Sequence, residues 1–317
     1  MPDRLTAYVT GTEVCEYMGG PAGLYGLWRE VAAERPWETR MGLAQFSRKY
    51  LDDPFSRKGF ALSASERGRI VAAALVALSP EMGRAWLRLW VSPASRGKGL
   101  GARLLDESVL RLRKREKWRL ECEIVPFCPG YAAFFKARGF KPDEGYPGGY
   151  LMRRLLDAPP TMEPLRSCAI LRLGDAEIPA YLDRMASVEI GYEGEAGHGV
   201  SLDDYKEELA ASMADAKASC YTLATEGERV LGYSRSALVE NVAGELQLRN
   251  RGLVVSPESR GSGIGRALLD DNLAWGYRVG ARVAYISTHS KNPAKRLYER
   301  AGYEVVETVE NLIIIIK

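Results

Sequence analysis

The chain contains the same block of sequence twice, and this repeat restricts its fold more than any other feature. Residues 91–106 read VSPASRGKGLGARLLD and residues 255–270 read VSPESRGSGIGRALLD, which are identical at eleven of sixteen positions. A second match, at a shift one residue smaller, relates AFFKARGF (133–140) to RLYERAGY (296–303). Two matched blocks in the same order indicate a duplicated domain rather than a chance match.

The repeat divides the chain near residue 160. The segment DAPPTMEP (157–164) contains three prolines and is typical of a linker. We therefore expect two domains of similar size, residues 1–158 and residues 165–317. A length of 317 residues agrees with two domains of ordinary size.

Composition excludes several classes of protein. Apolar residues make up 46% and charged residues 27% of the chain, which is typical of soluble globular proteins. No apolar run approaches the roughly 18 residues that a membrane helix needs. The N-terminal sequence MPDRLTAYVT lacks the charged and then apolar pattern of a secretory signal. These features predict a cytoplasmic protein without membrane contact.

Cysteine and histidine usage argues against metal and hydrolase chemistry. The five cysteines are scattered, and no Cys-x-x-Cys pair is present. His198 and His289 are the only histidines, so we expect no metal site. There is also no Gly-x-Ser-x-Gly turn of the kind that α/β-hydrolases use for their nucleophile.

Charge is divided unevenly between the two halves. Residues 1–158 carry 26 Lys and Arg against 18 Asp and Glu, and the remainder carries 18 against 23. The basic excess is concentrated in RLRKREKWR (111–119). A basic helix without interleaved aromatic residues is typical of a solvated face, so we consider nucleic acid an unlikely partner.

Each half has the order of strands and helices that is typical of a mixed α/β sheet. In the second half, Pro293 fits the first turn of a short helix and Gly302 fits its end. The predicted helices there are 176–190, 202–217, 264–279 and 293–301, and the predicted strands are 219–225, 229–239, 244–255, 282–288 and 311–317. The first half repeats this order, with strands at 59–62, 69–77, 84–91, 119–125 and 150–156 and helices at 100–115 and 131–137.

The repeated block places Arg-Gly-x-Gly-x-Gly between a strand and a helix. Glycines at a helix start let the backbone approach a ligand, and the N–H groups there form an anion site that suits a pyrophosphate. A dinucleotide fingerprint is disfavoured because Arg266 stands where that motif needs a small residue. A nucleotide-triphosphate loop is disfavoured because neither copy has Gly-Lys-Ser/Thr.

Together these motifs resemble the GNAT superfamily of acyl-CoA-dependent N-acyltransferases. The resemblance rests on Val-x-Pro-x-x-Arg-Gly-x-Gly-x-Gly after a strand, followed about 30 residues later by Asn-Pro-Ala-x-x-Leu-Tyr-Glu-x-x-Gly-Tyr. It covers both halves, and the layout is similar to that of mycothiol synthase and other double-domain GNAT proteins. It implies two tandem GNAT-like domains, with acetyl-CoA or another acyl-CoA as co-substrate and no metal.

The resemblance also implies which residues contact the coenzyme. In this family the glycine-rich turn binds the pyrophosphate, and the strand before it receives the pantetheine arm. Gly252 within that strand fits a β-bulge or a close backbone approach. The implied strand residues are Leu253, Val254 and Val255 in the second half and Trp90 and Val91 in the first. The implied loop residues are Arg260, Gly261, Ser262, Gly263, Ile264 and Gly265, together with Asn292, and in the first half Arg96, Gly97, Lys98, Gly99, Leu100 and Gly101.

Acyl transfer from a thioester needs a neutral amine, a group that takes its proton and a donor for the departing thiolate. In many family members a tyrosine on the later helix is the donor, which implies this role for Tyr298. The first half has Phe135 at the equivalent position and Pro129 in place of Asn292. Glu245, at the start of the third strand of the second half, is the candidate base.

These features predict an N-acetyltransferase that acts on the amine of a small molecule, with catalysis in the second half. Tyr131 lies one helical turn before Phe135 and offers an alternative hydroxyl, but we expect the first half to be catalytically degenerate. Two alternatives are an acyl-CoA-binding regulatory or scaffold protein and an aminoacyl transferase of the tandem GNAT type. The basic helix favours the latter, and retention of both loops counts against it. The sequence leaves open the acceptor and whether the protein is a monomer or a homodimer.

Overall fold

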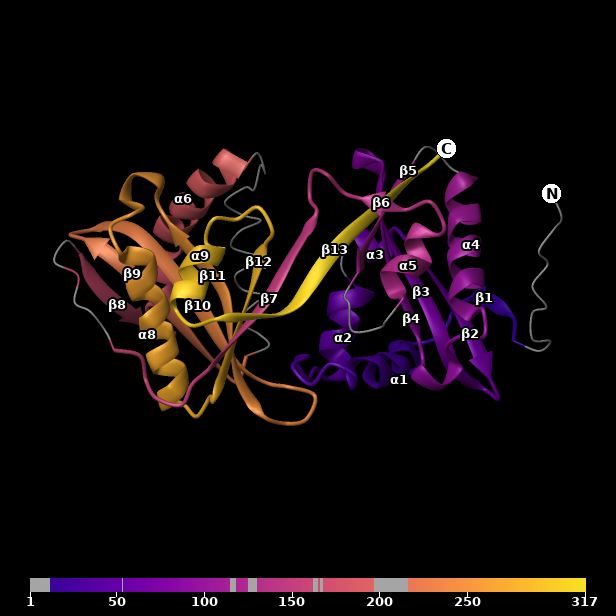
Figure 1. Cartoon of the computed structure of the whole chain (residues 1–317), viewed down its shortest axis with the longest axis horizontal. Coiled ribbons are helices and arrows are strands. Elements are labelled where there is room, and N and C mark those ends of the chain that lie inside the picture. Colours follow the sequence, from indigo (N-terminus) through magenta and orange to yellow (C-terminus); the bar gives the residue numbers. More distant parts are fainter. Residues whose placement is uncertain are drawn as a thin grey trace. The chain divides into compact units, whose positions relative to one another are not determined.

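The chain folds into two compact units (Figure 1). The computed structural model describes residues 12–52, 54–114, 118–124, 130–161, 165, 168–196 and 216–317. Unit 1 comprises residues 1–148 and 309–317, and unit 2 comprises residues 149–308.

Unit 1 is a mixed sheet in the order β1-β2-β3-β4-β5-β13, in which only β4 and β5 run parallel among the described pairs. A short strand, β6, pairs with β13. The strands are β1 (Val14–Glu16), β2 (Phe60–Glu66), β3 (Arg69–Ser79), β4 (Arg84–Val91), β5 (Trp118–Ile124), β6 (Lys141–Pro142) and β13 (Glu304–Ile316). The helices are α1 (Pro21–Ala32), α2 (Leu43–Tyr50), α3 (Pro54–Arg57), α4 (Leu100–Arg113) and α5 (Tyr131–Lys136), with 3₁₀ turns at Pro80–Met82 and Pro93–Ser95.

Unit 2 has the same kind of sheet, in the order β7-β12-β11-β10-β9-β8, with β11 and β12 parallel. The strands are β7 (Gly148–Leu155), β8 (Ala169–Leu173), β9 (Ala218–Glu226), β10 (Arg229–Glu240), β11 (Leu246–Val255) and β12 (Val283–His289). The helices are α6 (Ile178–Ala196), α8 (Ile264–Arg278) and α9 (Lys295–Arg300), with a 3₁₀ turn at Pro257–Ser259. The predicted elements agree with these bounds to within a few residues, except that the last strand begins at Glu304 and the helix predicted at 202–217 lies almost entirely outside the described residues.

The last strands of the two repeats are exchanged between the units. β7, from the first repeat, pairs antiparallel with β12 of unit 2 over residues 149–155. β13, from the second repeat, pairs antiparallel with β5 of unit 1 over residues 310–316. Figure 1 shows this as the yellow strand β13 next to β5. The compact units therefore differ from the sequence repeats at their final strands.

The core of unit 1 follows from the apolar patterns of its strands and helices. β3 is buried along nearly its whole length, as expected for a central strand covered on both faces. β4 alternates, so that Ala85, Leu87 and Leu89 are buried on the side of α4. Helix α4 presents Leu104 and its apolar neighbours to the same cluster. Within this cluster lies Leu312 of β13, which has no exposed surface.

In unit 2, apolar clusters lie on both faces of the sheet. On one face, residues of α8 and α9 pack with Leu248 of β11 and Ile286 of β12. On the other face, Met185 and its neighbours on α6 pack with Tyr233 of β10 and Val254 of β11. We call these the α8 face and the α6 face. The first face carries the glycine-rich loop at the start of α8.

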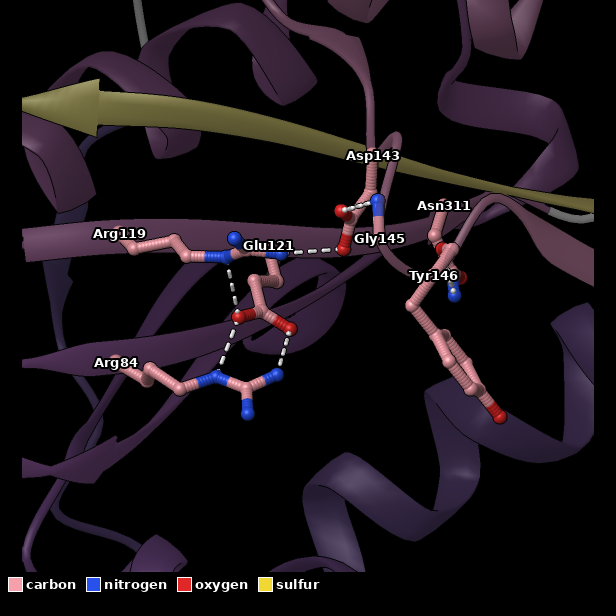
Figure 2. A network of polar contacts seen from close by, with 7 residues as sticks. All are labelled: Arg84, Arg119, Glu121, Asp143, Gly145, Tyr146 and Asn311. Carbon is pink, nitrogen blue, oxygen red and sulfur yellow. Dashed lines mark hydrogen bonds and ion pairs between the residues drawn. The ribbon is translucent and has the colours of Figure 1, made fainter. Parts of the chain in front are cut away.

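A network of charged side chains joins the sheet of unit 1 to the segment after β6 (Figure 2). Arg84 Nε and Nη2 donate to the two carboxylate oxygens of Glu121, at 2.6 and 2.8 Å, and Arg119 Nε donates to the same carboxylate at 2.9 Å. Arg119 also pairs with Asp143, which is only 3% exposed and accepts the N–H of Gly145 at 3.0 Å. The N–H of Asp143 donates to the carbonyl of Asn311 on β13 at 2.9 Å. The network therefore fixes the exchanged strand to its sheet.

Asp143 should contribute to the pH dependence of stability. Burial alone raises the pKa of this carboxyl, but the hydrogen bonds from Tyr146 N–H, Arg119 and Gly145 N–H outweigh burial and lower it. The stabilisation is therefore complete above the pKa of an unfolded aspartate, about 3.9, and is lost as the pH falls through the lower folded pKa. We expect Asp143→Asn to lower the free energy of unfolding of unit 1 by about 1.5–3 kcal/mol at neutral pH.

Urea unfolding of the wild type and of Asp143→Asn between pH 2 and pH 7 measures this contribution. The difference between the two proteins should shrink toward the acid end of that range. Asp106→Asn is the matched control, because Asp106 is exposed on α4. An equal loss of stability in both variants would contradict the role of the network.

Candidate functional site

Both copies of the glycine-rich turn form a helix N-terminus directly after a strand. In unit 2 the turn connects β11 to α8, and in unit 1 it connects β4 to α4. The residues that precede each helix, Gly263 and Gly99, have φ values of +89° and +79°. Because side chains other than glycine are strained in this left-handed region, the sequence requires glycine at both positions. The first N–H groups of each helix have no partner within the helix, and they and the helix dipole favour an anion.

The third glycine of each turn brings the helix close to the strand. A Cβ at Gly101 would lie 3.6 Å from Val91 Cγ2, and a Cβ at Gly265 would lie 3.7 Å from Val255 Cγ2 and 3.3 Å from Leu297 Cδ2. Val91 and Val255 therefore face the helices. The predicted loop residues 96–101 and 260–265 thus form two turns of the same construction.

The charged groups around the two loops differ. In unit 1, Arg96 pairs with Glu34, to which Nη1 donates at 2.9 Å, and Lys98 Nζ lies 3.6 Å from Glu66. In unit 2, Arg260 Nε donates to the carbonyl of Val255 at 3.2 Å. Ser262 replaces the lysine, and its hydroxyl donates to the Ser259 carbonyl at 2.5 Å. Carboxylates therefore neutralise part of the positive charge of the first loop.

β11 contains the bulge that Gly252 predicts. Arg235 of β10 lies opposite Gly252, and Ser236 lies opposite Asn250, so Arg251 is the extra residue. A bulge interrupts the ladder and leaves backbone groups unpaired. In unit 1, β4 pairs with β3 in unbroken register from Arg84 to Val91. Only the second repeat therefore has a bulge in this strand among the described pairs.

Beyond the bulge, β11 separates from its parallel neighbour. Within the described residues, the pairing of β11 with β12 covers Leu248 to Asn250. The corresponding pairing of β4 with β5 covers Arg84 to Trp86. The free edge that this leaves on β11 includes Leu253, Val254 and Val255, and it runs directly into the loop. An extended ligand arm can lie along such an edge and bond its backbone groups.

Tyr298 lies on the α8 face next to this separation. It is 5% exposed and belongs to the apolar cluster that contains Leu248 and Ile286. Tyr303 packs against it with ring centroids 6.2 Å apart. Burial raises the pKa of Tyr303 far above its usual value, so its hydroxyl stays protonated and donates to Asn250 Oδ1 at 2.6 Å.

Asn292 and Glu245 have local roles in the structure. The side-chain oxygen of Asn292 accepts the N–H of Ala294 at 2.9 Å and thereby holds the turn before α9. Glu245 is exposed in the hairpin between β10 and β11, where its carboxylate accepts the side-chain N–H of Asn241 at 2.9 Å. It precedes the bulge by six residues, about 20 Å of extended strand.

In unit 1, aromatic side chains cover the sheet face opposite α4. Trp90 packs against Phe46 and Tyr50 of α2, with ring centroids 5.9 and 5.3 Å apart. Trp86 packs against Phe55 of α3 at 5.3 Å. The predicted contact residue Trp90 therefore points to α2.

In unit 1, the Tyr131 hydroxyl bonds β4 beyond Trp86, where the described pairing of β4 with β5 ends. Tyr131 OH donates to the carbonyl of Leu89 at 2.8 Å, and the ring packs edge-on against Phe135 at 5.2 Å. Phe135, at the position of Tyr298, is fully buried. A ligand arm along this edge of β4 would compete with Tyr131 for the Leu89 carbonyl.

Sequence reasoning missed the polar residues of the α6 face in unit 2. These are Glu189 of α6, which accepts a hydrogen bond from Tyr233, and arginines of three different strands. No motif marks them, because they come from separate parts of the chain. Across the described ranges, no group of three or more His, Cys, Asp or Glu side chains is placed to hold a metal ion. None of the helices in the described part of the chain is long and apolar enough to cross a membrane.

Comparison with known proteins gives a consistent result. The model of the acetyltransferase (GNAT) domain matches the chain twice, at residues 57–142 and 217–305. Together the two matches cover more than half of the chain. No curated protein matches its sequence.

Several solved structures are similar to the whole chain. A tandem GNAT protein from the clavulanic acid biosynthesis pathway has a TM-score of 0.75 at 19% identity, covering 97% of this chain and 99% of that one. A GCN5-related N-acetyltransferase from Sphaerobacter thermophilus has a TM-score of 0.71 at 18% identity, covering 98% of each chain. A GNAT-family acetyltransferase from Colwellia psychrerythraea has a TM-score of 0.62 at 12% identity, covering 95% and 99%. At these identities the similarity establishes the fold, with two such domains in tandem.

Proposed function

The chain belongs to the GNAT acetyltransferase domain family, and on this basis we propose that it transfers an acyl group from acetyl-CoA to the amine of a small molecule in unit 2. The observation that carries the proposal is an anion-binding loop at the end of a strand that separates from its neighbour at a bulge. A pyrophosphate at residues 260–265 places the pantetheine arm along the free edge of Leu253–Val255. The thioester then lies near the bulge.

The chemistry requires two proton movements. The amine nitrogen attacks the thioester carbonyl carbon, the C–S bond breaks, and the thiolate takes up a proton while the nitrogen loses one. Tyr298 is our donor to the thiolate, because it lies beside the strand separation and has a hydroxyl where unit 1 has Phe135.

For the proton of the amine, two carboxylates are candidates. Glu245 lies in the hairpin, six residues before the bulge. Glu189 bonds Tyr233, whose strand partner Val254 follows Gly252 by only two residues. We propose Glu189 as the base, because the tyrosine that it bonds lies opposite a residue of β11 that is closer to the bulge than Glu245 is. Glu245→Gln should then retain most of the activity, and Glu189→Gln should not.

We propose that unit 1 does not catalyse transfer. In unit 1, β4 has no bulge among the described pairs, and α5 has Phe135 where α9 of unit 2 has Tyr298. Aromatic side chains also cover the face from which an acceptor would approach. Its loop keeps the geometry of an anion site, so we assign it coenzyme binding without turnover. This division agrees with a duplicated domain in which one copy retains the chemistry.

Tyr298→Phe tests the assignment of the active unit. We expect the turnover number to fall about 100-fold, since general acid catalysis commonly contributes 10²–10⁴. The KM for acetyl-CoA should change little, because the ring remains in place. Thiol release with a panel of amines, followed from pH 6 to pH 10, gives both parameters. Phe135→Tyr is the matched variant in unit 1 and should leave the rate unchanged. Equal rates for wild type and Tyr298→Phe at every pH would refute the role.

A further inference from the structure

Three arginines from three strands lie on the α6 face of unit 2, around the point where β11 and β12 separate. They are Arg235 of β10, Arg249 of β11 and Arg153 of β7, and we call them the arginine triad. All three are half-buried. This face is the one opposite α8, and it includes the bulge near which our proposed function places the thioester.

Gly252 allows Arg235 to reach this place. A Cβ at residue 252 would lie 2.9 Å from Arg235 Nε and 3.2 Å from its Cγ. The Arg235 side chain therefore lies directly over the β11 backbone at the bulge. A larger residue at 252 would push this side chain away, so the glycine leaves open the space that Arg235 occupies.

Arg249 and Arg153 lie on either side of Tyr285. Arg249 is the parallel-strand partner of Tyr285, and Arg153 is its antiparallel partner on β7. The Arg249 guanidinium carbon lies 4.6 Å from the centroid of the Tyr285 ring. Burial raises the pKa of Tyr285, and the positive charges of Arg249 and Arg153 act against that increase. β11 and β7 each lie about 4.8 Å from β12, so the backbones of Arg249 and Arg153 are about 10 Å apart, a gap that two long side chains can span to one ligand.

Two carboxylates face the same region. Glu189 of α6 accepts the hydroxyl of Tyr233, which neighbours Arg235 on the same side of β10. Glu245 lies in the hairpin before β11, and its negative charge raises the pKa of Tyr285. In the described part of this face, Glu189 therefore lies on one side of the bulge. Arg249 and Arg153 lie on the other side, where they flank Tyr285.

From this arrangement we infer that the acceptor is an amine that also carries a carboxylate, of the amino-acid class. The inference rests on the proposed function for the position of the reacting amine. The amine faces Glu189 near the bulge, and the carboxylate is bound by Arg249 and Arg153. A guanidinium offers paired N–H donors that match the two oxygens of a carboxylate. On the corresponding face of unit 1, aromatic rings of α2 and α3 cover Trp90 and Trp86.

Matched pairs of amines test the inference. Tyrosine against tyramine and lysine against cadaverine differ only in the carboxylate. We expect the wild type to use the carboxylated member of at least one pair with a kcat/KM about 10–100 times higher, since hydrogen bonds to charged groups have that effect on binding. Arg249→Gln and Arg153→Gln should each reduce this preference by about tenfold or more. Neither should change the KM for acetyl-CoA.

Two controls separate recognition from folding. Arg278→Gln removes an exposed arginine of α8 and should leave the preference unchanged. Arg249→Lys keeps the charge but loses the paired donors, and it should give an intermediate preference. Circular dichroism of each variant confirms that it folds.

Binding measured by calorimetry in the presence of CoA distinguishes this inference from the proposed function. If CoA binds and a carboxylated amine binds more weakly to Arg249→Gln than to Arg278→Gln, the inference holds even where no acetylation occurs, and only the proposed function fails. If the decarboxylated amines are acetylated or bound as well as their partners, the inference is wrong and the proposed function stands. Failure of every carboxylated amine to bind also overturns it.

Discussion

A chain that ends at Thr308 should lose the fold of unit 1 and keep that of unit 2, although the deletion lies at the opposite end of the sequence from residues 1–148, which form most of unit 1. The deletion removes the part of β13 that pairs with β5 over residues 310–316. Leu312 and Ile316, which are 0% and 2% exposed, leave the core of unit 1. Burial of such a side chain contributes about 1.5–3 kcal/mol, so the two together contribute about 3–6 kcal/mol, which matches the low end of the stability of an ordinary domain, about 5–15 kcal/mol.

Hydrogen exchange with mass spectrometry measures this effect by segment. Amides of β4 and β5 should exchange far faster in the truncated chain, while those of β10 and β11 should keep their protection. Point variants give a milder version of the same test. Leu312→Ala should cost about 2–5 kcal/mol, and Ile315→Ala, which alters a side chain that is 45% exposed on the same strand, should cost less than about 1 kcal/mol. Unchanged protection of β5 in the truncated chain would contradict the strand exchange.

This exchange marks the limit of what the sequence predicts about the fold. The strands themselves are predictable, because alternation in β4 and the apolar run of β3 reflect burial on one or both faces. Their partners are not, because β7 and β13 occupy equivalent places in the two repeats, and no local pattern indicates which of them pairs with β5.

The candidate site likewise has a part that the sequence predicts and a part that it does not. The loops are predictable because Gly99 and Gly263 occupy a backbone region closed to other residues, and a helix start with unpaired N–H groups has one obvious use. The bulge at Gly252 is predictable for a different reason, because a glycine within a strand is typical of a bulge or a close backbone approach. The arginine triad is not, because Arg153 and Arg249 are almost a hundred positions apart and meet only through the exchange of β7. Positions defined by pairing between distant strands leave no local pattern.

Gly263→Glu should abolish coenzyme binding in unit 2. The φ value of +89° is unfavourable for any side chain and costs about 1–2 kcal/mol. The new carboxylate also lies at the helix N-terminus, where it occupies the anion site and repels a pyrophosphate. A Cβ at this position would lie 3.3 Å from Leu165 Cδ2, so this leucine side chain must shift by a few tenths of an ångström to accommodate it. We therefore expect a folded protein with acetyl-CoA affinity at this site reduced at least 100-fold and with no turnover.

Two matched variants isolate the cause. Gly244→Glu has nearly the same φ, +87°, in the exposed hairpin before β11, with nothing within 4 Å of the added Cβ. It reproduces the backbone strain without a charge at the loop, so it should lower stability slightly and leave acetyl-CoA binding intact. Gly99→Glu makes the same change in unit 1. If titration calorimetry of the wild type shows two coenzyme sites, each loop variant should remove one, and only Gly263→Glu should remove turnover. Loss of turnover in Gly99→Glu with activity retained in Gly263→Glu would reverse the assignment of the catalytic unit.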